Sequence, residues 1–171
     1  MSRKIIAIDP GTTDGAYVVW DCTAEKLIES KILPNDKLLE FIKQQEFTTE
    51  VFCEMIACYG MAVGKETFET CVWIGRCEQI CADRGHSFSR VYRLAVKVHH
   101  CHSAKAKDPN VRQALIDRFG IVGIKKAPGP LWGVASHIWS ALAIATFASD
   151  TTAHKSAVDE AMELSTKQSG S

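Results

Sequence analysis

The first apolar segment of the chain ends on an acid at a sharp turn. Residues 5–8 are Ile-Ile-Ala-Ile, Asp9 follows them, and Pro10-Gly11 comes next. A short apolar run bounded by Pro and Gly predicts a buried strand, so Asp9 is expected at its end. Burying an ionised carboxylate is costly unless a cation neutralises it. The segment therefore predicts an acid that binds a metal ion or faces a phosphate group.

A second acid occupies the same kind of position. Residues 51–55 form a short apolar run that contains Glu54 and leads into a loop with Gly60. Turn signals and apolar residues together predict five strands, at residues 4–9, 15–21, 26–32, 51–55 and 88–92. The short links between the first three strands favour an antiparallel meander.

Apolar residues at helical spacing predict four helices. The first helix begins near residues 34–36. The other three cover residues 65–84, about 108–119, and 131–149, and the last of these bears His137. Residues 99–102 are expected to be extended. The order of elements predicts an α/β fold in which helices flank a mixed five-stranded sheet. We expect one domain, residues 1–149, and a polar, mobile tail at residues 150–171.

Length and composition narrow the class of protein. The chain has 171 residues, enough for one domain with a substantial core. No apolar run approaches the roughly 20 residues of a membrane span, and the N-terminus lacks the apolar region of a secretory signal. Seven cysteines, an odd number, suggest reduced thiols rather than a disulfide framework. We expect a cytoplasmic protein with no membrane partner.

The net charge of zero conceals a strong asymmetry. Residues 84–126 hold ten basic and two acidic side chains, whereas residues 21–83 hold six basic and twelve acidic ones. A basic face on an otherwise acidic protein is able to bind a phosphodiester backbone. The neutral total therefore does not exclude a nucleic acid partner.

Several segments, in order, resemble the RuvC family of Holliday junction resolvases, and two of them resemble bacteriophage members in particular. The family-wide segments are Ile6-Ala7-Ile8-Asp9-Pro10-Gly11, Phe52-Cys53-Glu54 and the run Ser136-His137-Ile138-Trp139-Ser140-Ala141-Leu142-Ala143-Ile144-Ala145; the phage-like ones span residues 68–76 and 105–115. The resemblance covers residues 4 to about 145. It implies a ribonuclease H-like fold, a homodimer, and metal-dependent paired nicking of four-way DNA junctions, leaving 5′-phosphate and 3′-hydroxyl ends, within a bacterial host cell.

The resemblance also assigns roles to the acids. Asp9 is expected to bridge two Mg²⁺ or Mn²⁺ ions about 4 Å apart, with Glu54 and His137 as further ligands. Many relatives carry another aspartate where this chain has Ser140, and a hydroxyl is a weak ligand, so the second ion is expected to bind weakly or through water. Asp14 is an alternative source of the missing charge.

DNA contacts are expected along the basic segment and beside the loop after Glu54. The expected contacts are Lys97, Lys105, Lys107, Arg112, Tyr59 and Met61. Tyr59 and Met61 lie where relatives place a residue that wedges into the junction. On an extended segment, neighbours among His99, His100, Cys101 and His102 point to opposite faces, so we expect them along the DNA-facing surface rather than around a zinc ion. The helix at residues 65–84, with Trp73 and Ile74, is expected either at the dimer interface or as an ordinary core helix.

The sequence is also compatible with other roles for these residues and with other functions. Asp9 is also compatible with a structural Asp-Pro-Gly turn, His137 with a core histidine, and the lysines with a solvated face. Residues 8–13 also resemble the first phosphate loop of actin and Hsp70-type ATPases, whose second domain and further phosphate loops have no counterpart in this sequence. A junction-binding protein with weak or no cleavage is a third possibility, because of Ser140.

Overall fold

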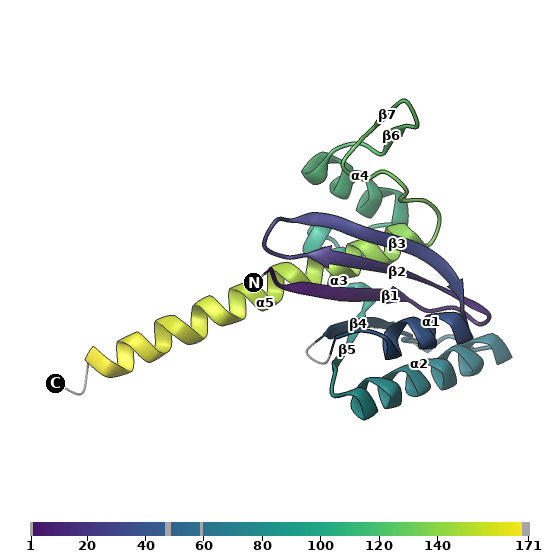
Figure 1. Cartoon of the computed structure of the whole chain (residues 1–171), viewed down its shortest axis with the longest axis horizontal. Helices are drawn as coiled ribbons and strands as arrows, with labels where there is room; N and C mark the ends of the chain where they lie inside the picture. Colours follow the sequence, from purple (N-terminus) through teal and green to yellow (C-terminus); the bar gives the residue numbers. More distant parts are fainter. Residues whose placement is uncertain (1, 47–48, 59, 169–171) are drawn as a thin grey trace.

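The computed structural model describes residues 2–46, 49–58 and 60–168, with side chains to residue 153. Five strands form one mixed sheet in the order β3-β2-β1-β4-β5, as Figure 1 shows. The strands are β1 (Lys4–Asp9), β2 (Asp14–Asp21), β3 (Lys26–Pro34), β4 (Glu50–Met55) and β5 (Ser87–Tyr92). The first three are antiparallel neighbours, while β1, β4 and β5 run parallel.

Helices cover both faces of this sheet. They are α1 (Asn35–Lys43), α2 (Lys65–Arg84), α3 (Arg93–Cys101), α4 (Asp108–Phe119) and α5 (Ile138–Gln168). Helices α1 and α2 pack on one face, and α3, α4 and α5 lie on the other (Figure 1). The arrangement confirms the predicted α/β fold with a mixed five-stranded sheet and an antiparallel first half.

Alternation along β1 explains how one short strand supports both layers. Successive side chains of a strand point to opposite faces. Ile5 and Ala7 join the cluster under α5, and Ile6 and Ile8 join the cluster under α1 and α2. All four are almost fully buried. By the same alternation, Asp9 belongs to the α5 face.

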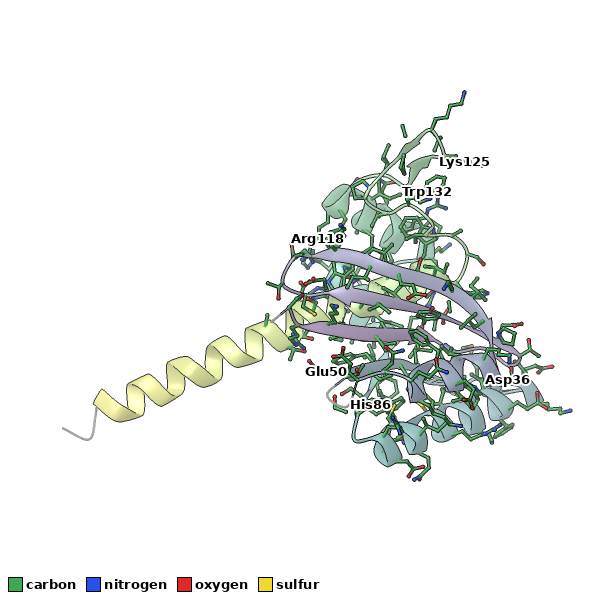
Figure 2. The ribbon with its side chains drawn as sticks, in the orientation of Figure 1. Asp36, Glu50, His86, Arg118, Lys125 and Trp132 are labelled. Atoms are coloured by element: carbon green, nitrogen blue, oxygen red, sulfur yellow. The ribbon has the colours of Figure 1, made fainter. Side chains whose placement is uncertain are left out.

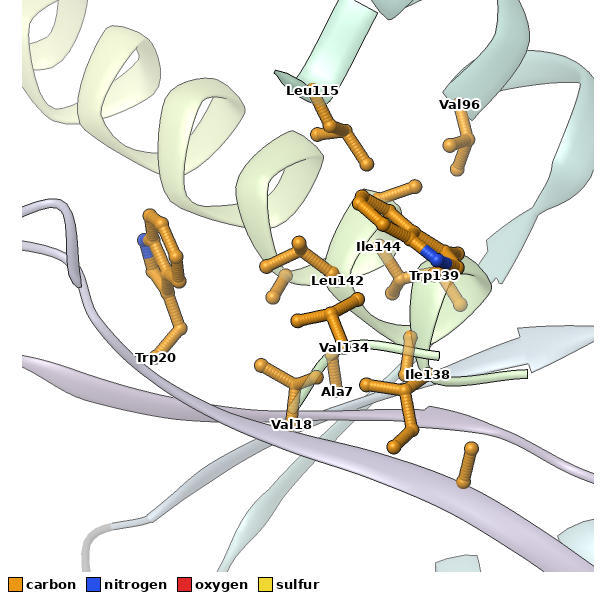
Figure 3. Packing of buried hydrophobic residues seen from close by; sticks show 14 of the residues in the cluster. Ala7, Val18, Trp20, Val96, Leu115, Val134, Ile138, Trp139, Leu142 and Ile144 are labelled. Atoms are coloured by element: carbon orange, nitrogen blue, oxygen red, sulfur yellow. The ribbon is translucent and has the colours of Figure 1, made fainter. Parts of the chain in front are cut away.

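The larger core lies between the sheet and the first half of α5. Leu142 and Ile144 of α5 share one buried cluster with Ala7, Val18 and Trp20 of the sheet, and Figure 3 shows Leu142 beside Val18 and Ala7. The helix segment after Ser140 is almost entirely apolar, as expected for a helix buried against the sheet. This packing fixes the beginning of α5 over the end of β1.

Asp150 attaches α5 to its surroundings through two side chains. Arg118 of α4 bonds to Asp150 at 2.6 Å and 3.0 Å, and to Glu25 in the β2–β3 turn at 2.7 Å (Figure 2). The His99 ring lies 2.7 Å from Asp150. Burial acts to raise the pKa of Asp150, but its bonds to Arg118 and His99 outweigh this effect and lower the pKa.

The prediction that residues 99–102 are extended is wrong. His99, His100 and Cys101 belong to α3, and His102 adopts a left-handed conformation at its end. His100 Nε2 lies 2.9 Å from the carbonyl oxygen of Ala143 on α5. His99 and His100 therefore hold α3 against α5, and the predicted alignment of both side chains along a DNA-facing surface is wrong.

The last helix differs from its predicted limits at both ends. It begins at Ile138, so His137 precedes the helix, and it continues to Gln168 through most of the predicted polar tail. In Figure 1 its second half extends away from the sheet. Before it, a small hairpin of β6 (Gly123–Ile124) and β7 (Ala127–Pro128) carries Lys125, which points outward in Figure 2.

Helix α2 has the predicted limits, and Trp73 and Ile74 are buried within the chain itself. They pack with α1 and the sheet, so these two side chains belong to the core of the chain, and a dimer contact by α2 would have to use its other face. The exposed apolar side chains of α2 are Phe68 and Val72. None of the helices in the described ranges combines the length and apolar character that a membrane span requires.

Candidate active site

The ends of three parallel strands bring two acids and a base together. Asp9 ends β1, Glu54 is the penultimate residue of β4, and Arg93 directly follows β5. Parallel strands end at the same edge of a sheet, and the pairing of Glu54 with Val91 sets the stagger of β4 against β5. Alternation places Asp9 and Glu54 on the α5 face. Arg93, the first residue of α3, reaches Glu54 on that same face.

The turn after Asp9 is fixed by α1. Asn35 Nδ2 donates to the carbonyl oxygens of Gly11 and Thr12 at 3.0 Å and 2.9 Å. A Cβ atom at Gly11 would lie 2.3 Å from the carbonyl oxygen of Asp14, so only glycine fits there without backbone movement. The Pro-Gly signal in the sequence therefore marks a tight turn that holds Asp9 in place.

Asp9 contacts His137 across the face of the sheet. His137 Nδ1 lies 3.1 Å from Asp9 Oδ2. The Asp9 side chain is only 13% exposed, whereas that of His137 is 75% exposed. The carbonyl oxygen of His137 accepts hydrogen bonds from the backbone N–H groups of Ser140 and Ala141, so the first turn of α5 positions the imidazole.

Glu54 has a different partner from Asp9, because it is paired with Arg93. Arg93 Nη1 lies 3.3 Å from each carboxylate oxygen of Glu54, and Arg93 Nη2 bonds to Asp108 at the start of α4. The side chain of Glu54 is 16% exposed and that of Asp108 is 69% exposed. One guanidinium thus bridges an inner acid and an outer one.

Burial dominates the electrostatics of the two inner acids. It raises the pKa of Asp9, with partial compensation by His137 and Arg93. It also raises the pKa of Glu54, an effect that Arg93 opposes and the neighbouring Asp9 reinforces. Because both carboxylates resist ionisation, the site favours any additional cation that approaches them.

The other predicted site residues lie around this pair. Ser140 lines the same pocket as Glu54 and Arg93, between α3, α4 and α5, whereas Asp14 borders a hollow on the other side of Asp9 and His137. Met61 is exposed. Tyr59 lies outside the described residues.

Two of the predicted DNA contacts lie at the pocket itself. Lys97 and Arg112 line it, and the Arg112 guanidinium stacks 4.8 Å from the ring centroid of Trp139. Lys105 and Lys107 are exposed on the segment that leads into α4. In the described part of the chain, none of these four bases forms an ion pair with an acid.

Arg93 and Asp108 are site residues that the sequence analysis did not assign. Arg93 carries a recognisable signal, because it follows a predicted strand at the same kind of position as Asp9 and Glu54. Asp108 carries none, since its place at the site depends on how α4 packs. It stands near enough to raise the pKa values of Asp9 and Glu54.

The side chains of Asp9, Glu54 and His137 are chemically suited to bind a hard divalent cation. Two desolvated carboxylates and an imidazole are ligands that Mg²⁺ or Mn²⁺ accepts. Among the residues the structure describes, no three His, Cys, Asp or Glu side chains converge closely enough to hold an ion as they stand. The positive charge next to Glu54 comes from Arg93 instead.

The solved structures similar to this chain include two of a single protein. RuvC from Thermus thermophilus is 19% identical, with a TM-score of 0.62 over 84% of this chain and 92% of its own. Thermus thermophilus RuvC in complex with a Holliday junction substrate is also 19% identical, with a TM-score of 0.59 over 85% of this chain and 91% of its own. No protein-family model and no curated protein matches the chain. The likeness to these two solved structures shows that the chain has a RuvC-like, ribonuclease H-like fold.

Proposed function

We propose that this protein is a metal-dependent endonuclease that nicks branched DNA, and four-way junctions in particular. The observation that carries the proposal is the pair of buried acids, Asp9 and Glu54, at adjacent strand ends with His137 beside them. The RuvC-like fold supports it, because one structural neighbour was solved with a Holliday junction substrate. The phage-like segments favour a bacteriophage-type member.

In this proposal Asp9, Glu54 and His137 hold Mg²⁺ or Mn²⁺. When bound, such ions activate a water molecule and stabilise the leaving oxygen of the phosphodiester. His137 Nδ1 lies 3.1 Å from Asp9 Oδ2, so the imidazole and the carboxylate face each other and are proposed as ligands of the same ion. The Ser140 hydroxyl and the Asp14 carboxylate remain alternative sources of a further, water-mediated contact.

The basic side chains are proposed to bind the DNA backbone. Lys97 and Arg112 stand at the pocket next to Glu54, where they are able to position the phosphate to be cut. Lys105 and Lys107 extend this basic surface along the start of α4. Met61, together with Tyr59, is proposed to wedge into the junction from the loop after Glu54.

Paired nicks on two strands require two sites, so we propose that the active form is a homodimer. The exposed apolar side chains Phe68 and Val72 on α2 supply a surface suited to this contact. The mass of the protein in solution, measured by light scattering, tests the dimer separately from cleavage.

The direct test is cleavage of an end-labelled four-way junction in Mn²⁺ and in Mg²⁺. The wild type is expected to produce nicks whose 5′-phosphate and 3′-hydroxyl ends DNA ligase reseals, and Asp9→Asn is expected to produce none. Asp83→Asn is a matched control, because Asp83 is exposed at the end of α2. A wild type that leaves the junction intact, or an Asp9→Asn variant as active as the wild type, contradicts the proposal.

A junction-binding protein with weak or no cleavage is the second candidate. The Arg93–Glu54 pair favours it, because the guanidinium occupies one of the proposed metal ligands, and Ser140 supplies no charge. Tight junction binding without nicks in either metal would support this candidate. ATP hydrolysis by the protein would instead favour the phosphate-loop alternative.

A further inference from the structure

We propose that Arg93 is a displaceable counter-cation that competes with the divalent ion for Glu54, and that Asp108 receives Arg93 when the ion binds. The inference rests on the proposed function, since it concerns the same metal site. It assigns Arg93 and Asp108 as positioning residues that act on the metal through Glu54.

The geometry shows that Arg93 holds its two partners with different nitrogens. Nη1 lies 3.3 Å from each oxygen of Glu54, and Nη2 bonds to the more exposed Asp108. The two acids therefore share one guanidinium. Loss of the Glu54 contact leaves the Asp108 contact in place, so displacement does not leave the guanidinium without a partner.

The charges at the site also favour exchange. Asp9, Glu54 and Asp108 carry three negative charges when ionised, and Arg93 supplies one positive charge. A divalent ion at Asp9 and Glu54 would balance the remaining two. It would also repel a guanidinium that touches the same Glu54 oxygens, whereas the exposed Asp108 lies further out. Metal and Arg93 are thus competitors for one carboxylate.

The position of Arg93 permits such a movement. It is the first residue of α3, so only its side chain has to rearrange while the helix stays packed through His99 and His100. The pocket beside it is lined by Lys97 and Arg112, which already give that side of the site positive charge. A released guanidinium therefore turns toward Asp108 and not deeper into the pocket.

The experiment measures Mn²⁺ affinity of the DNA-free protein by electron paramagnetic resonance, which requires no cleavage. Arg93→Gln removes the competitor and is expected to tighten binding by about 5-fold or more, within the usual range of coupling between linked sites. Asp108→Asn removes the acceptor and is expected to weaken binding. Arg90→Gln is the matched control, because Arg90 of β5 forms a surface ion pair with Glu78 of α2, and its loss should leave the affinity unchanged.

The double variant Arg93→Gln/Asp108→Asn separates action through Arg93 from direct coordination. If Asp108 acts through Arg93, its substitution weakens Mn²⁺ binding less in the Arg93→Gln background than in the wild type. An equal loss in both backgrounds overturns the exchange and makes Asp108 a ligand. Should Arg93→Gln fail to fold, unchanged Mn²⁺ affinity in Asp108→Asn overturns the proposal.

Failure of this inference is distinguishable from failure of the proposed function. Mn²⁺ binding that Asp9→Asn abolishes but Arg93→Gln leaves unchanged overturns only the competition by Arg93. Absence of Mn²⁺ binding at Asp9 in the wild type and in Arg93→Gln overturns both.

Discussion

Asp9→Asn is expected to stabilise the metal-free protein while abolishing its stabilisation by metal. The Asp9 carboxylate is 13% exposed, and among the described residues its side chain has one hydrogen-bonding partner, the largely exposed His137. Burial raises the pKa of Asp9 despite the attraction of His137 and Arg93. A raised pKa means that the ionised carboxylate destabilises the folded state at neutral pH. Asparagine removes that charge and still accepts from the imidazole.

The expected gain is about 0.5–2 kcal/mol in the free energy of unfolding, the range that single stabilising substitutions commonly reach. For a chain of 171 residues, each kcal/mol shifts the melting temperature by about 2–4 °C. Mn²⁺ at about 100 times its Kd should stabilise the wild type by about 2.7 kcal/mol and the variant not at all. The order of stability therefore reverses when metal is added.

Thermal unfolding of both proteins, with chelator and with Mn²⁺, measures the two effects. The advantage of Asp9→Asn should shrink as the pH falls through the raised pKa of Asp9, because the wild-type carboxyl then becomes neutral. Asp83→Asn, on the surface of α2, controls for a general effect of charge. A metal-free Asp9→Asn variant that melts below the wild type at neutral pH would refute the argument from burial.

Three further outcomes follow from the packing and the charges. Leu142→Ala removes a fully buried side chain under α5 and should cost about 3–5 kcal/mol in urea denaturation; a loss below about 1 kcal/mol would contradict the assigned core. Asp150→Asn should cost about 1–3 kcal/mol at pH 7. Because the folded pKa of Asp150 is lowered, this difference should begin to shrink as the pH falls below about 4 and disappear below the folded pKa; a difference independent of pH would refute it. Junction affinity should fall steeply with salt, and Lys97→Ala or Arg112→Ala should each reduce the log–log slope by about 1 in fluorescence anisotropy; unchanged slopes would remove these residues from the DNA surface.

Local sequence pattern predicted the elements whose formation depends on their own residues. The apolar run before Asp9 gave β1 with its limits, and helix α2 covers the predicted residues 65–84 and ends at Gly85 in the left-handed conformation. Side-chain alternation and glycine termination act over a few residues, so they are visible without the fold.

Helix α3 shows where the same method failed. Leu94, Val96 and Val98 alternate as in a strand, and histidines and valines are weak helix formers. The segment is helical in the folded protein, where His99 and His100 bond to Asp150 and Ala143 on α5. The hairpin before α5 escaped prediction because each of its strands has only two residues.

The sequence by itself determined that two acids end apolar strands, the first and the fourth along the chain. It also determined that the bases cluster in residues 84–126. Only the tertiary structure decided which groups these acids meet: Asp9 contacts His137 from 128 residues away, and Glu54 is paired with Arg93 from 39 residues away. Strand ends and charge clusters follow from local chemistry, whereas the partner of a buried carboxylate depends on how distant helices pack over the sheet.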